Sequence, residues 1–412
     1  MIEYVMWAIS FVTLYIALIW LNFLYLGGID SKQKRSNFKP TVDIVIPAYN
    51  EQDHILQTLK SVLNLDYPPP KLHVFVVNDG STDETSSVVR KFIKNHKLNS
   101  RVTLIDKKRQ GKAAALNTAL SMSKAELFGC VDADSIVSRS SLKHMIHHFA
   151  DAKTGAVISD IKIYNPQNLI ERMQRVEYML AVLMRKIRAS IETLAMTPGV
   201  LSIYRTSVLR DVGGFDEQNI TEDFEIALRL KSHGYNVELE SESFTYTRAP
   251  RTLKQLWNQR IRWFRGYIHN HYKYKHMFFN KKYGLMAYFQ LPLNILGIPL
   301  LILTIGIVSY GAITHLTEII VRSILIKNYF SSLFYIPNPK DLVLGHNIKI
   351  MFPIYIAFVS GIYMLYVAHK QTKERFKYPL SLWAYFAILP YLSCVYWISA
   401  IIQEVTKMKK KW

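Results

Sequence analysis

Four long stretches without a formally charged side chain constrain this chain more than any other feature. They cover residues 5–29, 284–317, 351–369 and 378–403. Each reaches the roughly 18–20 residues that an α-helix needs to cross about 30 Å of hydrocarbon, and helices of soluble cores seldom run this long without a charge. We therefore expect a transmembrane anchor in residues 1–29, a central domain over 30–283, and a C-terminal membrane region of about three or four spans over 284–412.

Basic side chains suggest how these spans are oriented. Lysine and arginine follow the first stretch at positions 32–35, which favours a cytosolic location for the central domain. No basic residue precedes that stretch and its apolar run is too long for a signal peptide, so we interpret it as an uncleaved anchor. Four crossings would leave the lysines of 407–411 outside, against the rule. Crossing or re-entry by segment 319–336 would remove the conflict, and the number of C-terminal spans therefore stays open.

The net charge of +20 narrows the function when its position is considered. Residues 251–282 contain nine Lys or Arg and no acid, and they lie next to a predicted span. A nucleic-acid binder would keep its basic excess away from lipid. A transporter would place ionisable residues inside its spans, whereas these stretches contain only His315 and His369, near their ends. Cys130 and Cys394 lie in apolar surroundings and are expected to be buried, reduced thiols.

The central domain alternates β-rich runs with helical patterns. The predicted strands cover 42–46, 72–77, 102–105 and 127–131, and the predicted helices cover 55–63, 86–94 and 113–120. Such alternation predicts an α/β fold with a mostly parallel sheet and helices on both faces. Ligands bind such sheets beyond the carboxyl ends of the strands. No glycine-rich dinucleotide or P-loop motif follows any of these strands, which argues against a dehydrogenase and a P-loop NTPase.

Acidic side chains stand where the predicted strands end. Asp79 follows the second strand, and Asp132 and Asp134 follow the fourth. Carboxylates at positions i and i+2 of an extended chain project to the same side, and with substrate phosphates they suit Mg²⁺ or Mn²⁺. Aspartate is also common in turns, so the pair alone leaves a plain turn open.

Two further motifs lie on predicted helices. Thr221, Glu222 and Asp223 open a helical pattern with Thr221 as the expected N-cap, a sequence that an ordinary helix start would also explain. Residues 259–263, Gln-Arg-Ile-Arg-Trp, lie within a basic, aromatic segment. That segment is typical of a helix at a membrane surface. We expect interfacial helices near 166–193 and 251–276.

Taken together and in this order, the motifs resemble those of the processive family 2 glycosyltransferases. The resemblance covers about residues 40–270, and the flanking spans match membrane synthases of β-linked polysaccharides. It implies a GT-A-like fold. Three more segments carry it, namely Ile46-Pro47-Ala48-Tyr49-Asn50-Glu51, Gln110-Gly111-Lys112-Ala113-Ala114-Ala115-Leu116-Asn117 and Gly213-Gly214-Phe215-Asp216.

The resemblance also implies roles for individual residues. A uridine diphosphate sugar would be bound by Ala48, Tyr49, Glu51, Asp79 and Lys112. Asp132 would lie against the nucleotide and share a Mg²⁺ or Mn²⁺ ion with Asp134. Asp223 would be the catalytic base, with Glu222 as its rival. Arg262 and Arg260 would neutralise the departing diphosphate, Gln259 would belong to the same site, and Trp263 would stack on the growing sugar chain or merely anchor the helix in lipid.

Length and span layout within the family favour one product. They most resemble synthases of a β-1,6-linked N-acetylglucosamine polymer of biofilms, with a chitin- or hyaluronan-type synthase as the alternative. The expected partners are the UDP-sugar donor, the growing polysaccharide, the lipid bilayer and a small accessory membrane protein, with no nucleic acid. A scaffold without catalytic activity is disfavoured because every family acid is present.

Overall fold

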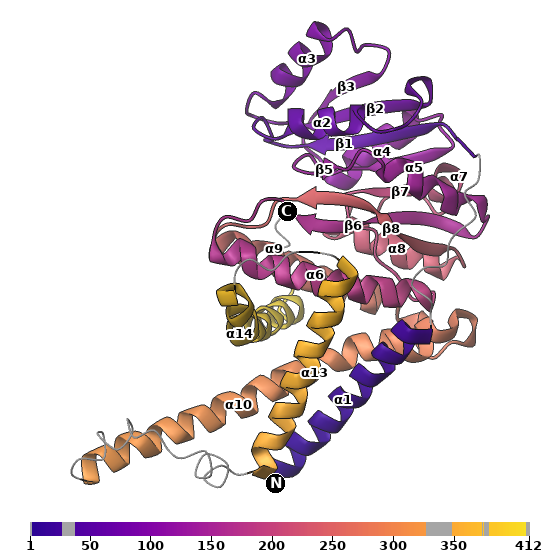
Figure 1. Cartoon of the computed structure of the whole chain (residues 1–412). Coiled ribbons are helices and arrows are strands. Elements are labelled where there is room, and N and C mark those ends of the chain that lie inside the picture. The colour runs from indigo at the N-terminus through magenta and orange to yellow at the C-terminus, as the bar shows by residue number, and fades with distance from the viewer. Residues whose placement is uncertain (1, 27–37, 327–347, 373, 375–378, 409–412) are drawn as a thin grey trace.

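The computed structural model describes residues 2–26, 38–326, 348–372, 374 and 379–408. A domain built on a β-sheet lies above a layer of helices, and long helices extend below that layer (Figure 1). The basic cluster at 32–35 and the end of segment 319–336 fall outside the described residues.

Eight strands of the described chain form one sheet in the order β3-β2-β1-β4-β7-β6-β8-β5. β1 pairs in parallel with β2 and β4, β2 pairs in parallel with β3, and β6 with β8, whereas β7 runs antiparallel to both β4 and β6. The predicted α/β class with a mostly parallel sheet is confirmed, and the antiparallel strands β7 and β5 make the sheet mixed. The bounds are β1 Val42–Ala48, β2 Leu72–Asp79, β3 Val102–Lys107, β4 Leu127–Cys130, β5 Ile136–Val137, β6 Thr154–Ile163, β7 Ser202–Arg205 and β8 Asn236–Thr247.

Alternation along β1 explains why helices cover both faces of the sheet. Ile44 and Ile46 pack in the core that α2 and α3 share, and Val45 packs with α4 on the opposite face. Successive side chains of a strand point to opposite faces, so a strand buried on both must be apolar throughout. The helices that form these cores are α2 Ile55–Leu63, α3 Thr85–Asn95, α4 Lys112–Met122, α5 Ser141–Met145, α7 Thr206–Asp211 and α8 Glu222–Ser232.

Helices α6 (Leu169–Ser190) and α9 (Leu253–Lys273) form the layer between the sheet and the long helices (Figure 1). Both were expected as interfacial helices, and each begins with a capping box, formed by Asn168 with Glu171 and by Thr252 with Gln255. These boxes satisfy backbone N–H groups that a helix start leaves without partners. One face of α6 packs against Trp20 of α1 and Leu365 of α13. The layer thus joins the domain to the long helices.

The long helices match the uncharged stretches of the sequence. They are α1 Ile2–Leu26, α10 Leu291–Leu325, α13 Ile348–Thr372 and α14 Pro379–Val405, and a π-helical turn, Met286–Gln290, precedes α10. Within the described residues, three helical stretches are long and apolar enough to cross a membrane: 4–25, 286–325 and 380–405. The stretch at 351–369 lies in α13. The 40 residues from Met286 to Leu325 extend about 60 Å, twice the hydrocarbon thickness.

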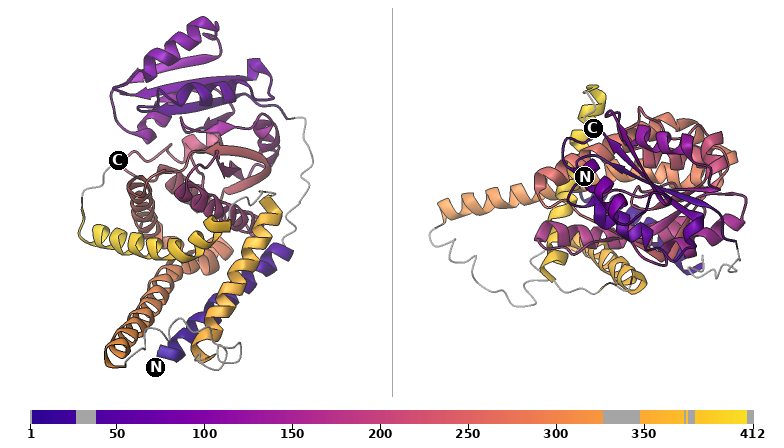
Figure 2. Two further views of the ribbon diagram at one scale, coloured as in Figure 1. Left: turned by 60° about the vertical axis from the view of Figure 1, so that its left-hand side comes forward. Right: turned by 90° about the horizontal axis from the view of Figure 1, so that it is seen from above.

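Helix α14 is tied to the interfacial layer near both of its ends. Ahead of it, Glu374 pairs with Arg175 of α6 at 2.6 Å, and at its end Glu404 pairs with Arg265 of α9 at 2.6 Å. Figure 2 shows α14 lying crosswise to α13 beneath the domain. A 27-residue helix is about 40 Å long, so two tethers on one layer hold it along that layer. Cys394 on α14 and Cys130 on β4 are both buried and free, as expected.

The start of α8 differs from the prediction at Thr221. Its hydroxyl makes no capping bond. Instead it donates to Asn219 Oδ1 at 3.3 Å and accepts from Asn270 Nδ2 of α9 at 3.0 Å, in a buried network. Gly266 of α9 lies directly against this side chain, because a Cβ there would be 2.1 Å from Thr221 Oγ1 and 2.4 Å from its Cγ2. Contact with α9, which sequence alone does not reveal, outweighs the local preference for a cap.

Replacing Gly266 by alanine should push α9 away from the start of α8. Overpacking of this kind typically costs about 1–3 kcal/mol, so Gly266→Ala should lower the melting temperature of the detergent-solubilised chain. Gly297→Ala is the matched control, because no atom lies within 4 Å of a Cβ at that helical position. Equal melting temperatures for Gly266→Ala and wild type would contradict the close contact.

Candidate active site

Lys112 brings together two of the predicted acidic motifs. It is the first residue of α4, and its Nζ lies 2.6 Å from Asp132 Oδ1 and 3.2 Å from Glu222 Oε1. Gly199 leaves room for this contact, because a Cβ there would be 2.2 Å from the Lys112 nitrogen. The electrostatic attraction of both acids raises the pKa of Lys112 against the opposing effect of burial, so the side chain is a permanent cation. The pairs place the end of β4 beside the start of α8.

Asp223 lies next to this cluster with a pKa suited to proton transfer. Burial and then the neighbouring Glu222 raise its pKa to about 6, against the opposing effects of Lys112 and Arg262. The sequence suggested that the helix start would favour the ionised form. Burial and the second acid outweigh that effect. A carboxylate with a pKa near neutrality is a stronger base than an exposed aspartate and is still largely ionised at pH 7.

Asp134 and Glu51 add two carboxylates to this cluster, and in both the effects of burial and of neighbouring acids outweigh those of nearby cations. Burial and then Asp132 raise the pKa of Asp134 to about 6, and burial, Asp134 and Asp132 raise that of Glu51 to about 7. Within the described residues, no three or more His, Cys, Asp or Glu side chains form a ready-made metal site. Mg²⁺ and Mn²⁺ often use one or two carboxylates and complete their shell with substrate phosphates. The donor set therefore fits a metal that arrives with a diphosphate.

Asp79 holds the loop ahead of Lys112 in place. Its Oδ1 accepts from Gln110 N at 2.9 Å and its Oδ2 accepts from Gly111 N at 2.7 Å. Gly80 permits the close approach of this loop, since its φ is +73° and a Cβ there would be 2.7 Å from the backbone nitrogen of Arg109. The structure therefore gives Asp79 a positioning contact in addition to the donor-binding role expected of it.

The side chain of Arg109, which the sequence did not single out, stacks on Tyr49. Ala48 is the buried last residue of β1, and Tyr49 follows it. The guanidinium of Arg109 lies 4.0 Å from the centre of the Tyr49 ring, and its Nη1 donates to the tyrosine hydroxyl at 2.9 Å. The only sequence signal for Arg109 is its place just before the 110–117 motif. Stacking of this kind forms a flat, cationic edge at the carboxyl end of β1.

The two arginines of the motif at 259–263 on α9 point to different neighbours. Arg262 faces the acids, where its charge acts on Asp223 and its Nη1 lies 3.5 Å from the backbone oxygen of Ile220. Arg260 instead donates to Glu177 Oε2 of α6 at 2.7 Å and stacks on Trp263 at 4.5 Å. Arg260 therefore joins α9 to α6 in this structure.

Gln259, the first residue of the same motif, is only partly exposed. Its Oε1 is buried and has no hydrogen-bond partner among the described residues. An unpaired buried amide oxygen is unfavourable unless a ligand or water completes it. The predicted site residues outside α9 lie where the carboxyl ends of β1, β2 and β4 meet the starts of α4 and α8.

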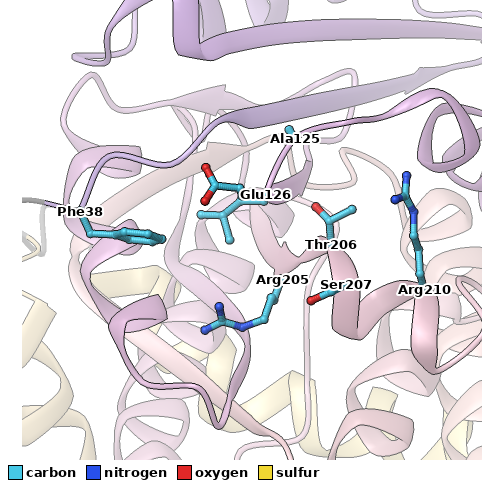
Figure 3. Close-up of a pocket in the computed structure, with 8 residues that line it drawn as sticks. Phe38, Ala125, Glu126, Arg205, Thr206, Ser207 and Arg210 are labelled. Carbon is cyan, nitrogen blue, oxygen red and sulfur yellow. The ribbon is translucent and has the colours of Figure 1, made fainter.

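A separate pocket of about 320 Å³ lies at the other end of β4 (Figure 3). Leu127, the first residue of β4, lines it, whereas Asp132 follows the last residue of that strand. Its arginines are engaged by backbone oxygens, Arg205 with Phe149 and Arg210 with Ser123. The predicted acids do not line this pocket, whose residues are Phe38, Ala125, Glu126, Leu127, Arg205, Thr206, Ser207 and Arg210.

Similar proteins of known sequence carry glycosyltransferase names. The poly-beta-1,6-N-acetyl-D-glucosamine synthase of Staphylococcus aureus strain MSSA476 is 33% identical over 243 residues, which are 56% of this chain and 57% of that protein. Its Staphylococcus epidermidis counterpart is 30% identical over 228 residues, 55% and 54% of the two chains. The probable glycosyltransferase YdaM of Bacillus subtilis is 30% identical over 288 residues, 66% and 69%. The chain thus matches about half the length of the synthases.

A solved structure and a family model agree with the observed fold. The mannosyltransferase PcManGT from Pyrobaculum calidifontis, solved in complex with GDP-Man and Mn²⁺, superimposes with a TM-score of 0.62. It covers 89% of this chain and 99% of its own at 20% identity, a likeness that concerns the fold. The model described as glycosyltransferase like family 2 matches residues 40–266, more than half of the chain. With its acids at the carboxyl end of a GT-A-like sheet, this chain belongs to the family 2 glycosyltransferases.

Proposed function

We propose that this glycosyltransferase transfers N-acetylglucosamine from UDP-N-acetylglucosamine, with inversion, onto a growing β-1,6-linked polymer of a biofilm matrix. The observation that carries the proposal is the bridge from Lys112 to Asp132 and Glu222, which gathers the strand-end acids and the α8 acids around one cation. The sugar and the linkage rest on the names of the staphylococcal relatives. Export of the polymer and a small accessory membrane protein belong to the same proposal.

The donor would bind across the carboxyl ends of β1, β2 and β4. Tyr49, with Arg109 stacked on it, offers a flat surface for the uracil ring, and Asp79 fixes the loop that presents Lys112. Asp132 and Asp134 would hold Mg²⁺ or Mn²⁺, with Glu51 close by. A bound metal ion supplies positive charge that stabilises the departing diphosphate. Lys112 and Arg262 would add their own charges at the same place.

The acceptor would approach from the side of α8 and α9. Asp223 takes the proton from the acceptor hydroxyl, which then attacks the anomeric carbon from the face opposite the diphosphate. Inversion of an α-linked donor gives a β-linked product. Glu222, paired with Lys112, maintains the raised pKa of Asp223. Trp263 offers its ring to the terminal sugar of the acceptor, and Gln259 supplies an unpaired amide oxygen.

We place this enzyme in the cell membrane with its catalytic domain in the cytosol, where UDP-sugars are made. Because α14 is tied to α6 and α9 near both ends, we propose that it lies in the membrane plane. The C-terminal region then has two crossings, α10 and α13, within the described residues. This arrangement keeps Lys370 and Lys407 on the cytosolic side, as the positive-inside rule requires, and differs from the expectation that 378–403 crosses.

Asp223→Asn tests the base. The amide cannot accept the proton, so transfer should fall at least about 10²-fold while UDP binding is retained. Labelled sugar incorporation measures transfer, and calorimetry with UDP and Mn²⁺ measures binding.

Two further measurements complete this test. Wild-type transfer at saturating metal should decline below about pH 6, because Asp223 becomes protonated there. Glu222→Gln should shift that decline to lower pH, since the second acid raises the pKa of Asp223. More than about a tenth of wild-type turnover in Asp223→Asn would exclude this residue as the base.

Removal of divalent metal tests Asp132 and Asp134. Excess chelator should abolish incorporation, and added Mn²⁺ or Mg²⁺ should restore it. Asp134→Asn should raise the Mn²⁺ concentration needed for half-maximal activity by about tenfold or more, because one of two protein ligands is lost. Asp66→Asn, which removes an exposed carboxylate paired with Lys143, is the control and should leave the requirement unchanged. Full activity in chelator would refute the metal role.

The product identifies the sugar and the linkage. Polymer made by the purified chain from UDP-N-acetylglucosamine should dissolve on treatment with a β-1,6-specific hexosaminidase, and chitinase and hyaluronidase should leave it intact. Parallel reactions with UDP-glucose and UDP-glucuronic acid serve as controls and should give no polymer. Digestion by chitinase would replace the proposed 6-linkage by a 4-linkage, and a requirement for UDP-glucuronic acid would indicate a hyaluronan-type product.

A further inference from the structure

The interfacial helix α6 carries two arginines, Arg185 and Arg188, with buried side-chain nitrogens that have no hydrogen-bond acceptor among the described residues. Arg185 is only 6% exposed, and both its Nε and Nη2 are buried without a partner among the described residues. Arg188, one turn further on, has a buried Nε without a partner. Desolvated guanidinium groups that lack acceptors are strongly unfavourable. Their retention indicates a ligand that supplies the acceptors.

The two arginines lie on a route from the acids toward the membrane. Tyr178, two helical turns before Arg185, is on the same face of α6. Burial raises the pKa of Tyr178, and the charges that act on it include those of Arg185 and Asp134. Arg188 lies 5.9 Å from the centre of the Trp20 ring near the domain end of α1. Tyr178 and Arg188 are about 15 Å apart along the helix axis, so this face leads from the surroundings of the strand-end acids toward α1.

The charge near this route does not balance. Of the nearby acids, Asp160 acts on Arg185 but lies 3.7 Å from Lys186, and Glu177 is bound by Arg260 at 2.7 Å. Arg185 thus shares one carboxylate with Lys186, and burial lowers the pKa of Arg188 with only Tyr267 acting in the opposite direction. A neutral sugar could accept hydrogen bonds from the two arginines but could not neutralise them, whereas a phosphate does both and matches the planar, forked geometry of arginine.

We propose that Arg185 and Arg188 bind the phosphate of a lipid-linked sugar, which serves as the acceptor on which synthesis starts. The proposal rests on the transfer reaction proposed above. The lipid tail would lie beside Trp20 and the sugar would extend along α6 toward Asp223. Transfer forms the bond between the acceptor oxygen and the anomeric carbon, breaks the bond from that carbon to the diphosphate, passes the proton to Asp223 and releases UDP.

Binding of dodecyl phosphate to the full chain in nanodiscs of neutral lipid tests the site. Wild type should bind radiolabelled dodecyl phosphate saturably, and Arg185→Gln and Arg188→Gln should each weaken binding at least about tenfold, the loss expected for a charge-assisted hydrogen bond. Arg185→Lys keeps the charge and should recover part of the affinity, which separates loss of the site from misfolding. Arg175→Gln is the control, because that arginine of α6 is already neutralised by Glu374.

Competition and donor consumption distinguish the possible outcomes. Dodecyl maltoside should not displace the probe, and inorganic phosphate should do so only at far higher concentration. Equal affinity in wild type and both glutamine variants, or equal displacement by the maltoside, would overturn the phosphate site. Displacement by inorganic phosphate at equal concentration would show that the site does not recognise the lipid part of the probe, and would overturn the proposal of a lipid-linked acceptor. UDP release from UDP-N-acetylglucosamine is measured separately, so its absence with phosphate binding intact would refute the proposed function alone.

Discussion

The ion pairs of Lys112 are the interaction on which the rest of the site depends. A partly buried ammonium keeps its charge when acids surround it, and here those acids come from the end of β4 and the start of α8. Without the lysine, the buried carboxylate of Glu222 would lose its ion-pair partner. The loop fixed by Asp79 determines where α4 begins, and Gly199 leaves the space that the ammonium fills. The parallel strands β1, β2 and β4 and the helix that carries Asp223 are joined at this point.

A second set of ion pairs joins α8 to α9 and α9 to α6. Arg260 binds Glu177 between α9 and α6, and Glu225, fully buried in α8, accepts from Lys273 and Tyr274 at the end of α9. Such pairs add little net stability compared with apolar packing, but breaking one leaves an uncompensated charge. They therefore specify one arrangement of α6, α8 and α9. The position of Asp223 relative to the membrane helices follows from that arrangement.

The sequence predicted the parts of this molecule that depend on local pattern. Alternation of apolar runs predicted β1 to β4 and their helices, and acids after strands indicated the candidate site, because both signals lie within a few residues. Contacts between residues that are far apart in the chain could not be predicted from the sequence. No residue near Thr221 in the sequence indicates that Asn270 donates a hydrogen bond to its hydroxyl. Likewise, no residue near Arg260 indicates its ion pair with Glu177, 83 residues earlier in the chain. The strands β6, β7 and β8 pair across large separations in the chain and were also missed.

The tethers of α14 have a mechanical consequence. With Glu374 and Glu404 held by arginines of α6 and α9, the sheet domain cannot rise from or tilt on α14 without breaking these ion pairs. The start of α8, which packs against Gly266 of α9, is thereby held at a fixed distance from α14. In the proposed polymerisation, the nascent glycan would advance by one unit after each addition while this part of the protein keeps its position. Translocation would thus be a property of the polymer sliding over a fixed surface.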